Sequence, residues 1–449
     1  MSDDLRPYQA DAIRAMLARD ASPLFTGRAL LADQPGLGKT RQILETHAQW
    51  AASQQPDGAG LAVVAPKSAK AVWAAEIVKW GYDLRVSILT GGQSWRWPEP
   101  GECVILNYAN LPWMPSQVRD AKDAGKRAGI PIAAVDWPVH LVTDECQALR
   151  KRKSLQHLRV RALSKKCAKV TGATGTPVGG EPFDLYGMLI ALGCCPWSWF
   201  EFLRKFSAYE LPHGGHDFRR NDRGEILVHP SVREDLDKIM IRRLRKDVAA
   251  DLPPKLYRYV NVDHKRATTA ELDRLGAVCA PYFDSDDLPP FTEFAYVRKL
   301  IAEERIPLIA PFQQEREERG EIGLLTSAHR APVEHAGSRA GWGMIHGDTP
   351  EGERGRLVES FERGDLRGLA IVLKSGATAL NLPSADYALF VDRSWDPDEN
   401  EQFEDRANRM NRTKGPIDVE IWTSDHPVSR HLVRILSIKT ALARAVLGE

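Results

Sequence analysis

The chain has 449 residues, a formal net charge of +1, 43% hydrophobic residues and 27% charged residues. This length suffices for two or three domains, and the composition excludes intrinsic disorder. No apolar run approaches the roughly 18 residues of a membrane helix. The small net charge excludes a histone-like polycation, although a local basic surface could still bind nucleic acid.

Two further features bear on the cell compartment. The N-terminal sequence MSDDLRPYQ is acidic and polar, which does not fit a secretory signal. The six cysteines form no CxxC pair, so we interpret them as reduced thiols. Both features predict a cytoplasmic protein.

The first half of the chain alternates apolar, β-branched-rich runs with amphipathic segments such as residues 40–52. This alternation predicts an α/β fold with a doubly wound, mostly parallel sheet flanked by helices. The runs expected to be strands are RALLAD (28–33), GLAVVAP (60–66), VSILT (86–90), CVILNY (103–108), HLVTD (140–144) and AKVTG (168–172).

The first of these runs leads into QPGLGKT and then a helix. The backbone N–H groups of a glycine-rich loop and of a helix N-terminus can cradle phosphates. Lys39 would reach the β- and γ-phosphates of a nucleotide, and the Thr40 hydroxyl would hold Mg²⁺. Asp33 stands where GxxxxGK[ST] has its first glycine, whereas Gly36 and Gly38 are present.

A second motif, VTDECQ, spans residues 142–147 and is acidic. Two carboxylates at the end of a buried strand are costly unless they meet a cation. Asp144 is placed to hold Mg²⁺, and Glu145 to orient and deprotonate the attacking water. The alternative is an acidic strand end that caps the next turn, and the upstream phosphate loop weakens it.

Two later strand exits, TGATGTP (171–177) and KSGATALNL (374–382), are rich in glycine and threonine. Their tight turns and hydroxyl groups could sense a phosphate, although either one alone reads as an ordinary loop. Ligands gather at the carboxyl ends of strands in open parallel sheets.

The middle of the chain, residues 196–257, has a different character and is where we place an insertion and linker. SVREDLDKIMIRRLRKDVAADLPPKL (231–256) reads as a basic helix closed by two prolines. His213 and His216 have no third ligand nearby, which favours a polar loop tip over a metal site. The basic clusters RKRK (150–153) and RRLRK (242–246) are by themselves expected to be solvated.

The second half also alternates apolar runs with amphipathic segments. Its expected strands are EIGLLTS (321–327), GWGMIHG (341–347), GLAIVLKS (368–375), YALFVD (387–392) and PIDVEIW (416–422). Near its end, QFEDRANRMNR (402–412) places three arginines on one helical face, namely Arg406, Arg409 and Arg412.

Taken together, these motifs resemble a superfamily-two helicase, and specifically the Swi/Snf-type DNA translocases. The resemblance runs from residue 5 to about residue 425 in the order of the family. It is carried by LRPYQ (5–9), LADQPGLGKT (31–40), VVAPKSAKAVWAAEIVKW (63–80), DECQ (144–147), TGTP (174–177), MIRRLRKDVAADLPPK (240–255), HGDTPEGERGRLVESF (346–361) and SWDPDENEQFEDRANRMNRTK (394–414). The missing Gln-Asn after TGTP brings the chain nearest the compact annealing-helicase branch.

The resemblance implies two tandem RecA-like lobes, residues 1–195 and 258–449, joined by the helical segment 196–257. ATP would bind with Mg²⁺ between the lobes, and double-stranded DNA would lie across both. The implied catalytic residues are Lys39, Glu145, Gln147, Arg406 and Arg409. The implied nucleotide-binding residues are Arg6, Gln9, Pro35, Gly36, Leu37, Gly38, Lys39, Thr40, Gly376 and Gln402, and Thr40 and Asp144 would hold Mg²⁺.

The chain departs from the family pattern at six positions. They are Gln147 for the histidine of DEAH, Ala377 and Ala379 for glycines, and Asn408, Asn411 and Arg412 for His, Gly and Gln. Because none of them removes a catalytic residue, we expect an active ATPase. For Arg412, which could contact a DNA phosphate or face water, we favour water.

Three functions follow from the resemblance. The first is a DNA-stimulated ATPase that translocates on duplex DNA, branched or forked with weak sequence preference, and remodels or reanneals it in replication, recombination or repair. The second is a strand-separating DNA or RNA helicase, and the third is a weakly active DNA-binding scaffold. No appended module or membrane segment is recognisable, and the compact chain suits a bacterial cell or a phage-infected one. In a eukaryote the protein would be nuclear.

Overall fold

The computed structural model describes residues 5–21, 25–54, 58–90, 95–111, 135–212, 216–248, 253–262, 270–271, 273–274, 277, 291–376, 380–408, 412 and 414–448. The chain divides into two compact units, Met1–Val248 with Leu442–Glu449, and Ala249–Ala441. The division at Val248 gives the segment 196–248 to the first unit.

The first unit is built on a seven-stranded sheet of order β3-β4-β2-β5-β6-β1-β9, and every pair of neighbours is parallel. Its strands are β1 (Arg28–Leu31), β2 (Gly60–Ala65), β3 (Arg85–Ile88), β4 (Glu102–Asn107), β5 (Val139–Asp144), β6 (Lys169–Ala173) and β9 (Met240–Ile241). The six strands expected in this half are all confirmed. β2, β4, β5 and β6 are almost wholly buried, because helices cover both faces of the sheet.

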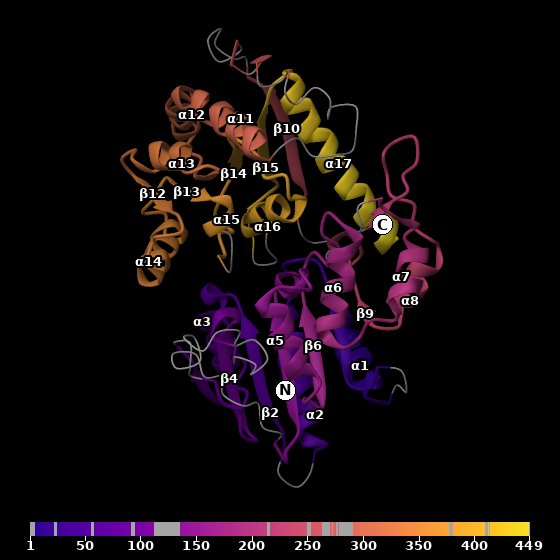
Figure 1. The fold of residues 1–449 in the computed structure, drawn as a ribbon. Helices are drawn as coiled ribbons and strands as arrows, with labels where there is room; N and C mark the ends of the chain where they lie inside the picture. Colours follow the sequence, from indigo (N-terminus) through magenta and orange to yellow (C-terminus); the bar gives the residue numbers. More distant parts are fainter. Residues whose placement is uncertain are drawn as a thin grey trace, which may run out of the picture. The chain divides into compact units, whose positions relative to one another are not determined.

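Helices cover both faces of this sheet (Figure 1). The helices of this unit include α1 (Pro7–Ala18), α2 (Lys39–Ala52), α3 (Lys70–Lys79), α5 (Leu155–Ser164), α6 (Pro182–Leu192), α7 (Trp199–Lys205), α8 (Ser231–Asp237) and α9 (Arg245–Val248). Successive side chains of a strand point to opposite faces. On β5, His140 stacks on His47 of α2, whereas Leu141 belongs to the core beneath α5 and α6. α2 therefore lies opposite α5 and α6.

The prediction of one basic helix over residues 231–256 is wrong. α8 ends at Asp237, β9 follows and pairs with β1, and α9 is a separate short helix. The apolar residues Ile239, Met240 and Ile241 are buried at the edge of the sheet, and this packing overrides the local helical pattern. A short antiparallel hairpin, β7 (Ala208–Glu210) and β8 (His216–Phe218), lies in the predicted insertion.

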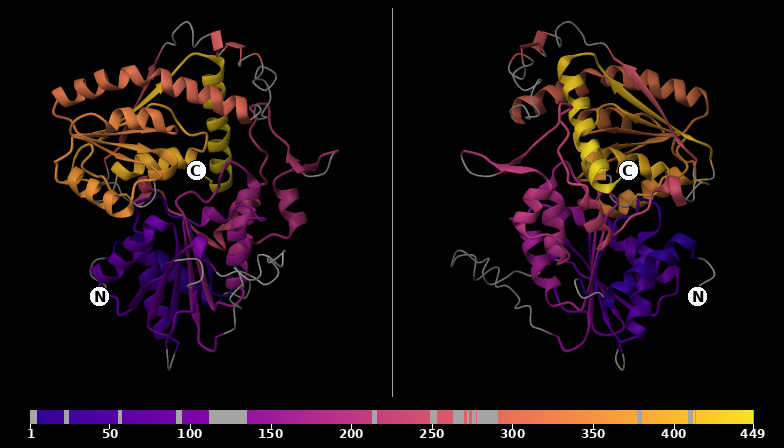
Figure 2. Two further views of the ribbon diagram at one scale, coloured as in Figure 1. Left: turned by 60° about the vertical axis from the view of Figure 1, so that its left-hand side comes forward. Right: turned by 90° about the vertical axis from the view of Figure 1, so that its right-hand side faces the viewer.

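The second unit has a six-stranded sheet of order β10-β15-β14-β11-β13-β12, again parallel throughout (Figure 2). Its strands are β10 (Lys255–Asn261), β11 (Gly323–Ser327), β12 (Trp342–Ile345), β13 (Gly368–Val372), β14 (Tyr387–Phe390) and β15 (Ile417–Thr423). Sequence reasoning missed β10 because this edge strand is mostly exposed and lacks an apolar run. The predicted fold class, two parallel-sheet RecA-like lobes, is confirmed.

The helices of the second unit are α11 (Phe291–Glu304), α12 (Ile306–Glu318), α13 (Arg330–Gly337), α14 (Glu351–Glu362), α15 (Leu373–Gly376), α16 (Pro397–Ala407) and α17 (Pro427–Leu447), of which the last turns belong to the first unit. Within the described ranges, no helix has both the length and the apolar character needed to cross a membrane. The five described cysteines are free thiols.

Candidate nucleotide-binding site

The motifs of the first unit meet at one edge of its sheet. β5, β6 and β1 are neighbours, and Ala173 of β6 pairs with both Asp144 of β5 and Leu31 of β1. The strands are parallel, so the glycine-rich loop after β1, the DECQ segment after β5 and the TGTP segment after β6 leave the sheet side by side. This edge is where open parallel sheets bind ligands.

The glycine-rich loop has a backbone that only glycine adopts readily. Gly36 and Gly38 have φ values of +88° and +76°. A Cβ on Gly38 would lie 2.5 Å from Gln9 Nε2, so a side chain there would displace Gln9. On the other side, a Cβ on Gly175 of TGTP would lie 2.6 Å from Pro35 Cγ. The loop is thus packed between two other predicted motifs.

The N-terminal glutamine motif is joined to this loop by hydrogen bonds. Gln9 Nε2 donates to the Leu37 carbonyl at 3.2 Å, and Gln9 Oε1 accepts from Arg6 N–H at 3.0 Å. Gln9 is buried, and Leu37 is fully buried. The structure therefore brings Arg6, Gln9 and Leu37 together with the phosphate loop, as a nucleotide site requires.

Asp33, at the position of the missing glycine, is fully buried and paired. Arg243 approaches its carboxylate at 3.2 Å, and Gln42 Nε2 donates to Asp33 Oδ2 at 3.1 Å. Burial raises the pKa of Asp33, while the charges of Arg243 and Lys39 oppose that rise. The carboxylate is an anchor for the loop rather than a free ligand.

The basic cluster 242–246 anchors the same loop, so the expectation of a solvated face is wrong for it. Arg242 donates to the Ala32 carbonyl at 2.7 Å, and Arg245 N–H donates to Gln34 Oε1 at 2.7 Å. β9 sets these residues beside β1. This cluster holds the phosphate loop in place.

Lys39 and Thr40 begin α2 directly after the loop. Lys39 Nζ donates to the Asp33 carbonyl at 2.7 Å, and the lysine is only half-buried. Its charge acts on the carboxylates of both Asp33 and Asp144. The ammonium group therefore lies between the phosphate loop and the acidic motif, where it can reach an anion.

Asp144 is held by groups from two other elements. Trp73 Nε1 of α3 donates to Asp144 Oδ2 at 2.9 Å, and the Tyr108 hydroxyl donates to the Asp144 carbonyl at 2.7 Å. Burial and the nearby charge of Glu145 raise the pKa of Asp144 to about 6, against the opposing effects of Trp73 and Lys39. A bound cation would favour the ionised form of this carboxyl.

Glu145 has a strained backbone. It has φ +50° and ψ +51°, and within the described ranges only Ser207 is another non-glycine residue with positive φ. Gln147 Nε2 donates to Glu145 Oε2 at 2.7 Å, which orients the carboxylate. Strain of this kind costs about 1–3 kcal/mol and clusters at functional sites. Gln147 thus holds the carboxylate of this strained residue in one orientation.

The residues present fit a polyphosphate with Mg²⁺. Thr40 and Asp144 offer the oxygen ligands that Mg²⁺ prefers. Three buried polar atoms at this edge have no hydrogen-bond partner within the described part of the chain, namely Thr143 Oγ1, Gln147 Oε1 and Thr176 Oγ1. Buried polar atoms are normally paired, so a polar ligand at this edge could supply their partners. The described residues contain no cluster of three His, Cys, Asp or Glu that could hold a metal alone.

In the second unit, α16 carries two of the predicted residues. Arg406 is buried, its guanidinium donates to the Leu380 carbonyl at 3.3 Å, and its own carbonyl accepts from Leu382 N–H at 2.9 Å. Gln402 is half-buried on the same helix, and Gly376 is the last residue of α15. Arg406 is thus tied to the segment that follows Gly376.

Several sequence-based expectations lie outside the described residues. They are the role of Arg409 and the departures Ala377, Ala379 and Asn411, together with His213 of the predicted loop tip. Asn408, another departure, directly follows α16. It is buried, and its backbone N–H donates to the Glu404 carbonyl at 3.2 Å.

The expectation that Arg412 faces water is wrong. Its side chain is only 7% exposed, and its guanidinium donates to four carbonyl groups at 2.5–3.3 Å, those of Pro383, Ala385, Gly415 and Pro416. Burial lowers the pKa of Arg412. This arginine joins the chain before β14 to the chain before β15 and has a structural role.

Sequence reasoning missed the residues that support the site. Trp73 lies in the helix after β2. A buried indole N–H needs an acceptor, and this general requirement is the only feature of the sequence that could have indicated a polar contact. Arg243 was assigned to a basic helix, and Tyr108 was part of an expected strand. Each contacts a residue far away in the sequence: 71 positions for Trp73, 210 for Arg243 and 36 for Tyr108. Local sequence patterns do not encode such contacts.

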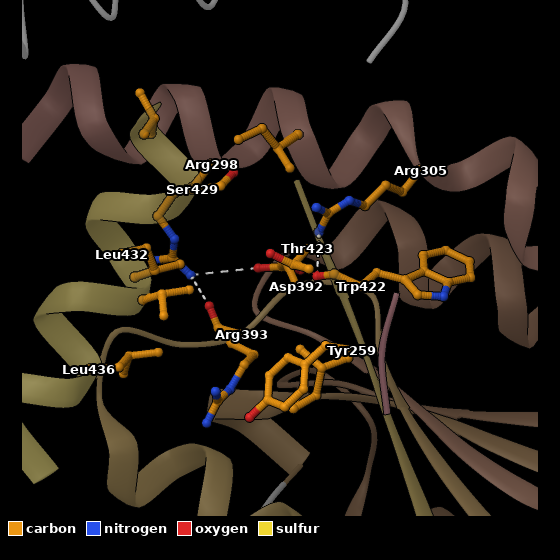
Figure 3. Close-up of a pocket in the computed structure, with 14 residues that line it drawn as sticks. Tyr259, Arg298, Arg305, Asp392, Arg393, Trp422, Thr423, Ser429, Leu432 and Leu436 are labelled. Carbon is orange, nitrogen blue, oxygen red and sulfur yellow. Dashed lines mark hydrogen bonds and ion pairs between the residues drawn. The ribbon is translucent and has the colours of Figure 1, made fainter. Parts of the chain in front are cut away.

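A separate pocket of about 60 Å³ lies wholly within the second unit (Figure 3). Apolar side chains of α11 and α17 line it, together with the ends of β14 and β15. Arg305 donates to the Val391 and Trp422 carbonyls, and Arg298 lies 3.5 Å from Asp392 and donates to the Arg393 carbonyl at 2.6 Å. The two arginines thus cap the strand ends, and the pocket contains none of the predicted site residues.

Two protein-family models match this chain. The SNF2-related domain matches residues 8–269, and the helicase conserved C-terminal domain matches residues 304–411. The DNA annealing helicase and endonuclease ZRANB3 of Bos taurus is 23% identical over 447 residues, covering 93% of this chain and 39% of the relative. A second relative is the SWI/SNF-related matrix-associated actin-dependent regulator of chromatin subfamily A-like protein 1 of Xenopus tropicalis. It is 25% identical over 475 residues, covering 100% of this chain and 46% of the relative.

The chain therefore spans less than half the length of these relatives. Among solved structures, the Sulfolobus solfataricus SWI2/SNF2 ATPase core in complex with dsDNA is similar, with a TM-score of 0.45 and 19% identity. That alignment covers 94% of this chain and 88% of the other.

Proposed function

The chain belongs to the SNF2-related family of superfamily-two ATPases, and on that premise we propose that it is an ATP-dependent translocase on double-stranded DNA. The observation that carries the proposal is the shared sheet edge, where Ala173 pairs with Asp144 and with Leu31 and so joins three motifs. Duplex DNA would raise ATP turnover by favouring the hydrolysis-competent arrangement of the two lobes.

In this proposal, the predicted site residues of the first unit have distinct roles. The loop N–H groups and Lys39 would bind the phosphates, and Gln9 would contact the base; its hydrogen bond to the Leu37 carbonyl, which ties it to the phosphate loop, supports this role. Glu145, oriented by Gln147, positions the attacking water and accepts its proton. Thr40 and Asp144 would hold Mg²⁺, which neutralises charge on the phosphates.

The second unit would supply the cations that stabilise the transferring phosphoryl group. Arg406 and Arg409 take this role in our proposal, with Gln402 and Gly376 beside the nucleotide. The hydrogen bond from the Arg406 guanidinium to the Leu380 carbonyl supports a fixed position for the first of these. Closure of the lobes on ATP and reopening after hydrolysis would move the protein along one strand.

The test is ATP turnover of the purified chain with and without linear duplex DNA, beside Lys39→Ala. We expect duplex to raise turnover at least tenfold and Lys39→Ala to abolish it. Flat turnover on adding duplex, together with no effect of Lys39→Ala, would instead establish the scaffold function.

The mode of action on DNA is a further part of the proposal. The name of the relative in Bos taurus, a DNA annealing helicase, supports reannealing and remodelling over strand separation. We expect the protein to displace a third strand from duplex DNA and to hydrolyse ATP faster on forked than on linear duplex. Release of a strand from a forked duplex would favour the strand-separating helicase instead.

A further inference from the structure

The stretch between the acidic motif and TGTP has an unusual charge. From Cys146 to Gly180 the sequence contains no Asp or Glu. The same stretch contains nine basic residues, Arg150, Lys151, Arg152, Lys153, Arg159, Arg161, Lys165, Lys166 and Lys169. The whole chain is almost neutral, so this concentration is local and needs a physical account.

Three of the nine basic residues are either paired with a carboxylate of the first unit or buried within it. Arg150 lies 3.6 Å from Asp184, Lys169 pairs with Asp20 at 2.5 Å, and Arg159 is buried. The other six side chains are exposed, and none of them forms an ion pair with a carboxylate of the described residues. They are Lys151, Arg152, Lys153, Arg161, Lys165 and Lys166, which we call the α5 basic face.

The six exposed cations lie on and around α5. Its buried residues include His157, Val160 and Leu163, which pack toward α6. Arg161 and Lys165 follow one another at helical spacing on the exposed side, and Lys151–Lys153 form the turn that precedes the helix. In Figure 1, α5 lies on the outside of the sheet of the first unit.

One cation of the face is held in place by aromatic rings. The Arg152 guanidinium lies 4.3 Å from the ring centre of Trp199 and 5.6 Å from that of Tyr186. Trp199 also stacks on Phe183 and Phe202 of the core. A guanidinium held on rings loses less conformational freedom when it binds an anion.

We propose that the α5 basic face is a binding surface for the phosphate backbone of DNA, separate from the nucleotide site. The inference rests on the proposed function for its choice of partner. The ten residues of α5 extend about 15 Å. Duplex DNA displays about nine phosphates over that length, so several of the six cations can each meet a phosphate.

An acidic protein segment is the other partner that a cationic face could bind. Leu155 and Leu158 are 45% and 38% exposed on the same helix and would contact such a segment. DNA fits better because the cations lie at both ends of α5, with Lys151–Lys153 before the helix and Arg161, Lys165 and Lys166 at its other end, a span that suits a long row of phosphates. A short acidic peptide would meet only part of this span.

The experiment compares two fourfold variants of the full chain in fluorescence-anisotropy binding of duplex DNA. The test variant carries Lys151→Gln, Lys153→Gln, Arg161→Gln and Lys165→Gln. The control carries Lys299→Gln, Arg319→Gln, Arg363→Gln and Arg367→Gln, whose cations each lie beside a carboxylate. All eight changes are at exposed positions, so circular dichroism and thermal unfolding should show folded proteins.

We expect the test variant to bind duplex at least tenfold more weakly near physiological salt. The slope of log affinity against log salt should become shallower by about 3, since up to four phosphate contacts are lost. The control should behave as the unchanged protein. Basal ATP turnover without DNA should be normal in both.

Two outcomes would overturn the inference. One is equal affinity and salt slope for the test variant and the unchanged protein. The other is equal DNA binding together with a loss of binding to poly-glutamate, which would assign the face to an acidic protein partner. A failure of the proposed function looks different, since the unchanged protein would then show no duplex-stimulated ATP turnover.

Discussion

The two units present their predicted residues in different ways. In the first, Gln9, Leu37, Gly38, Asp144 and Glu145 lie at one sheet edge, each in contact with another part of the site. In the second, Arg406 and Arg412, which the sequence placed on one helical face, make different contacts: Arg406 donates to the Leu380 carbonyl, whereas Arg412 is buried among the carbonyls of Pro383 and Ala385.

The difference lies in what fixes a side chain. A loop that leaves a parallel strand is placed by the register of the sheet, so the motifs of the first unit meet wherever the sheet forms. A residue beyond the end of a helix is placed by whichever acceptors lie near it. α16 ends at Ala407, so Arg406 lies in the helix whereas Arg412 lies beyond its end. Equal spacing therefore does not imply equal function.

The largest expected effect tests the role of the second unit directly. Arg409→Ala should reduce DNA-stimulated ATP turnover by about 10³–10⁵, the range for a cation that stabilises the transferring phosphoryl group. ATP binding, measured by nucleotide fluorescence, should be nearly unchanged. Near-normal turnover would remove Arg409 from the catalytic residues.

The matched prediction concerns Arg412, where we expect a loss of stability instead of catalysis. Arg412→Ala leaves the carbonyls of Pro383, Ala385, Gly415 and Pro416 without their donor and should cost about 3 kcal/mol of unfolding free energy. Chemical denaturation measures this, with the exposed Arg356→Ala as control. A folded Arg412→Ala protein should still hydrolyse ATP, and selective loss of turnover at full stability would contradict the structural role.

Much of this fold could be predicted from the sequence. All eleven strands expected from apolar runs are present, because buried parallel strands need continuous apolar residues. β9 and β10 could not be predicted, since the first is two residues long and the second is an exposed edge strand. For the site, the phosphate loop and the acidic motif were recognisable because their chemistry is local. The anchoring roles of Arg243 and Trp73 depend on contacts between distant segments.

A third prediction uses the histidines beneath the first sheet. His47 is buried without a hydrogen-bond partner in the described residues, and burial lowers its pKa to about 4 from an ordinary value of 6.5. Between pH 6.5 and pH 4 the unfolded chain binds more protons than the folded one, so the free energy of unfolding falls as the pH falls. For His47 the total loss is about 3 kcal/mol.

The measurement is urea unfolding at pH 7.5 and at pH 4.5, with His47→Leu beside the unchanged protein. The variant lacks this titration, so its stability should fall less across the same interval. Equal pH dependence in the His47→Leu protein would show that the pKa of His47 is the same in the folded and unfolded states.

The smallest expected effect tests whether the contacts of the first unit matter beyond holding the fold. Trp73→Phe keeps a buried ring but removes the N–H that holds Asp144 Oδ2 at 2.9 Å. Losing a group that orients a metal ligand weakens metal binding by about 10–100-fold, so the Mg²⁺ concentration for half-maximal ATP turnover should rise about tenfold. Maximal turnover should return at high Mg²⁺, because Glu145 and Gln147 are unchanged. Trp197→Phe is the control, since Trp197 is also buried and its Nε1 donates to Asp235 Oδ2 at 2.8 Å, outside the site. If both variants need equal Mg²⁺, the indole of Trp73 serves packing alone, and the sheet register suffices to place Asp144.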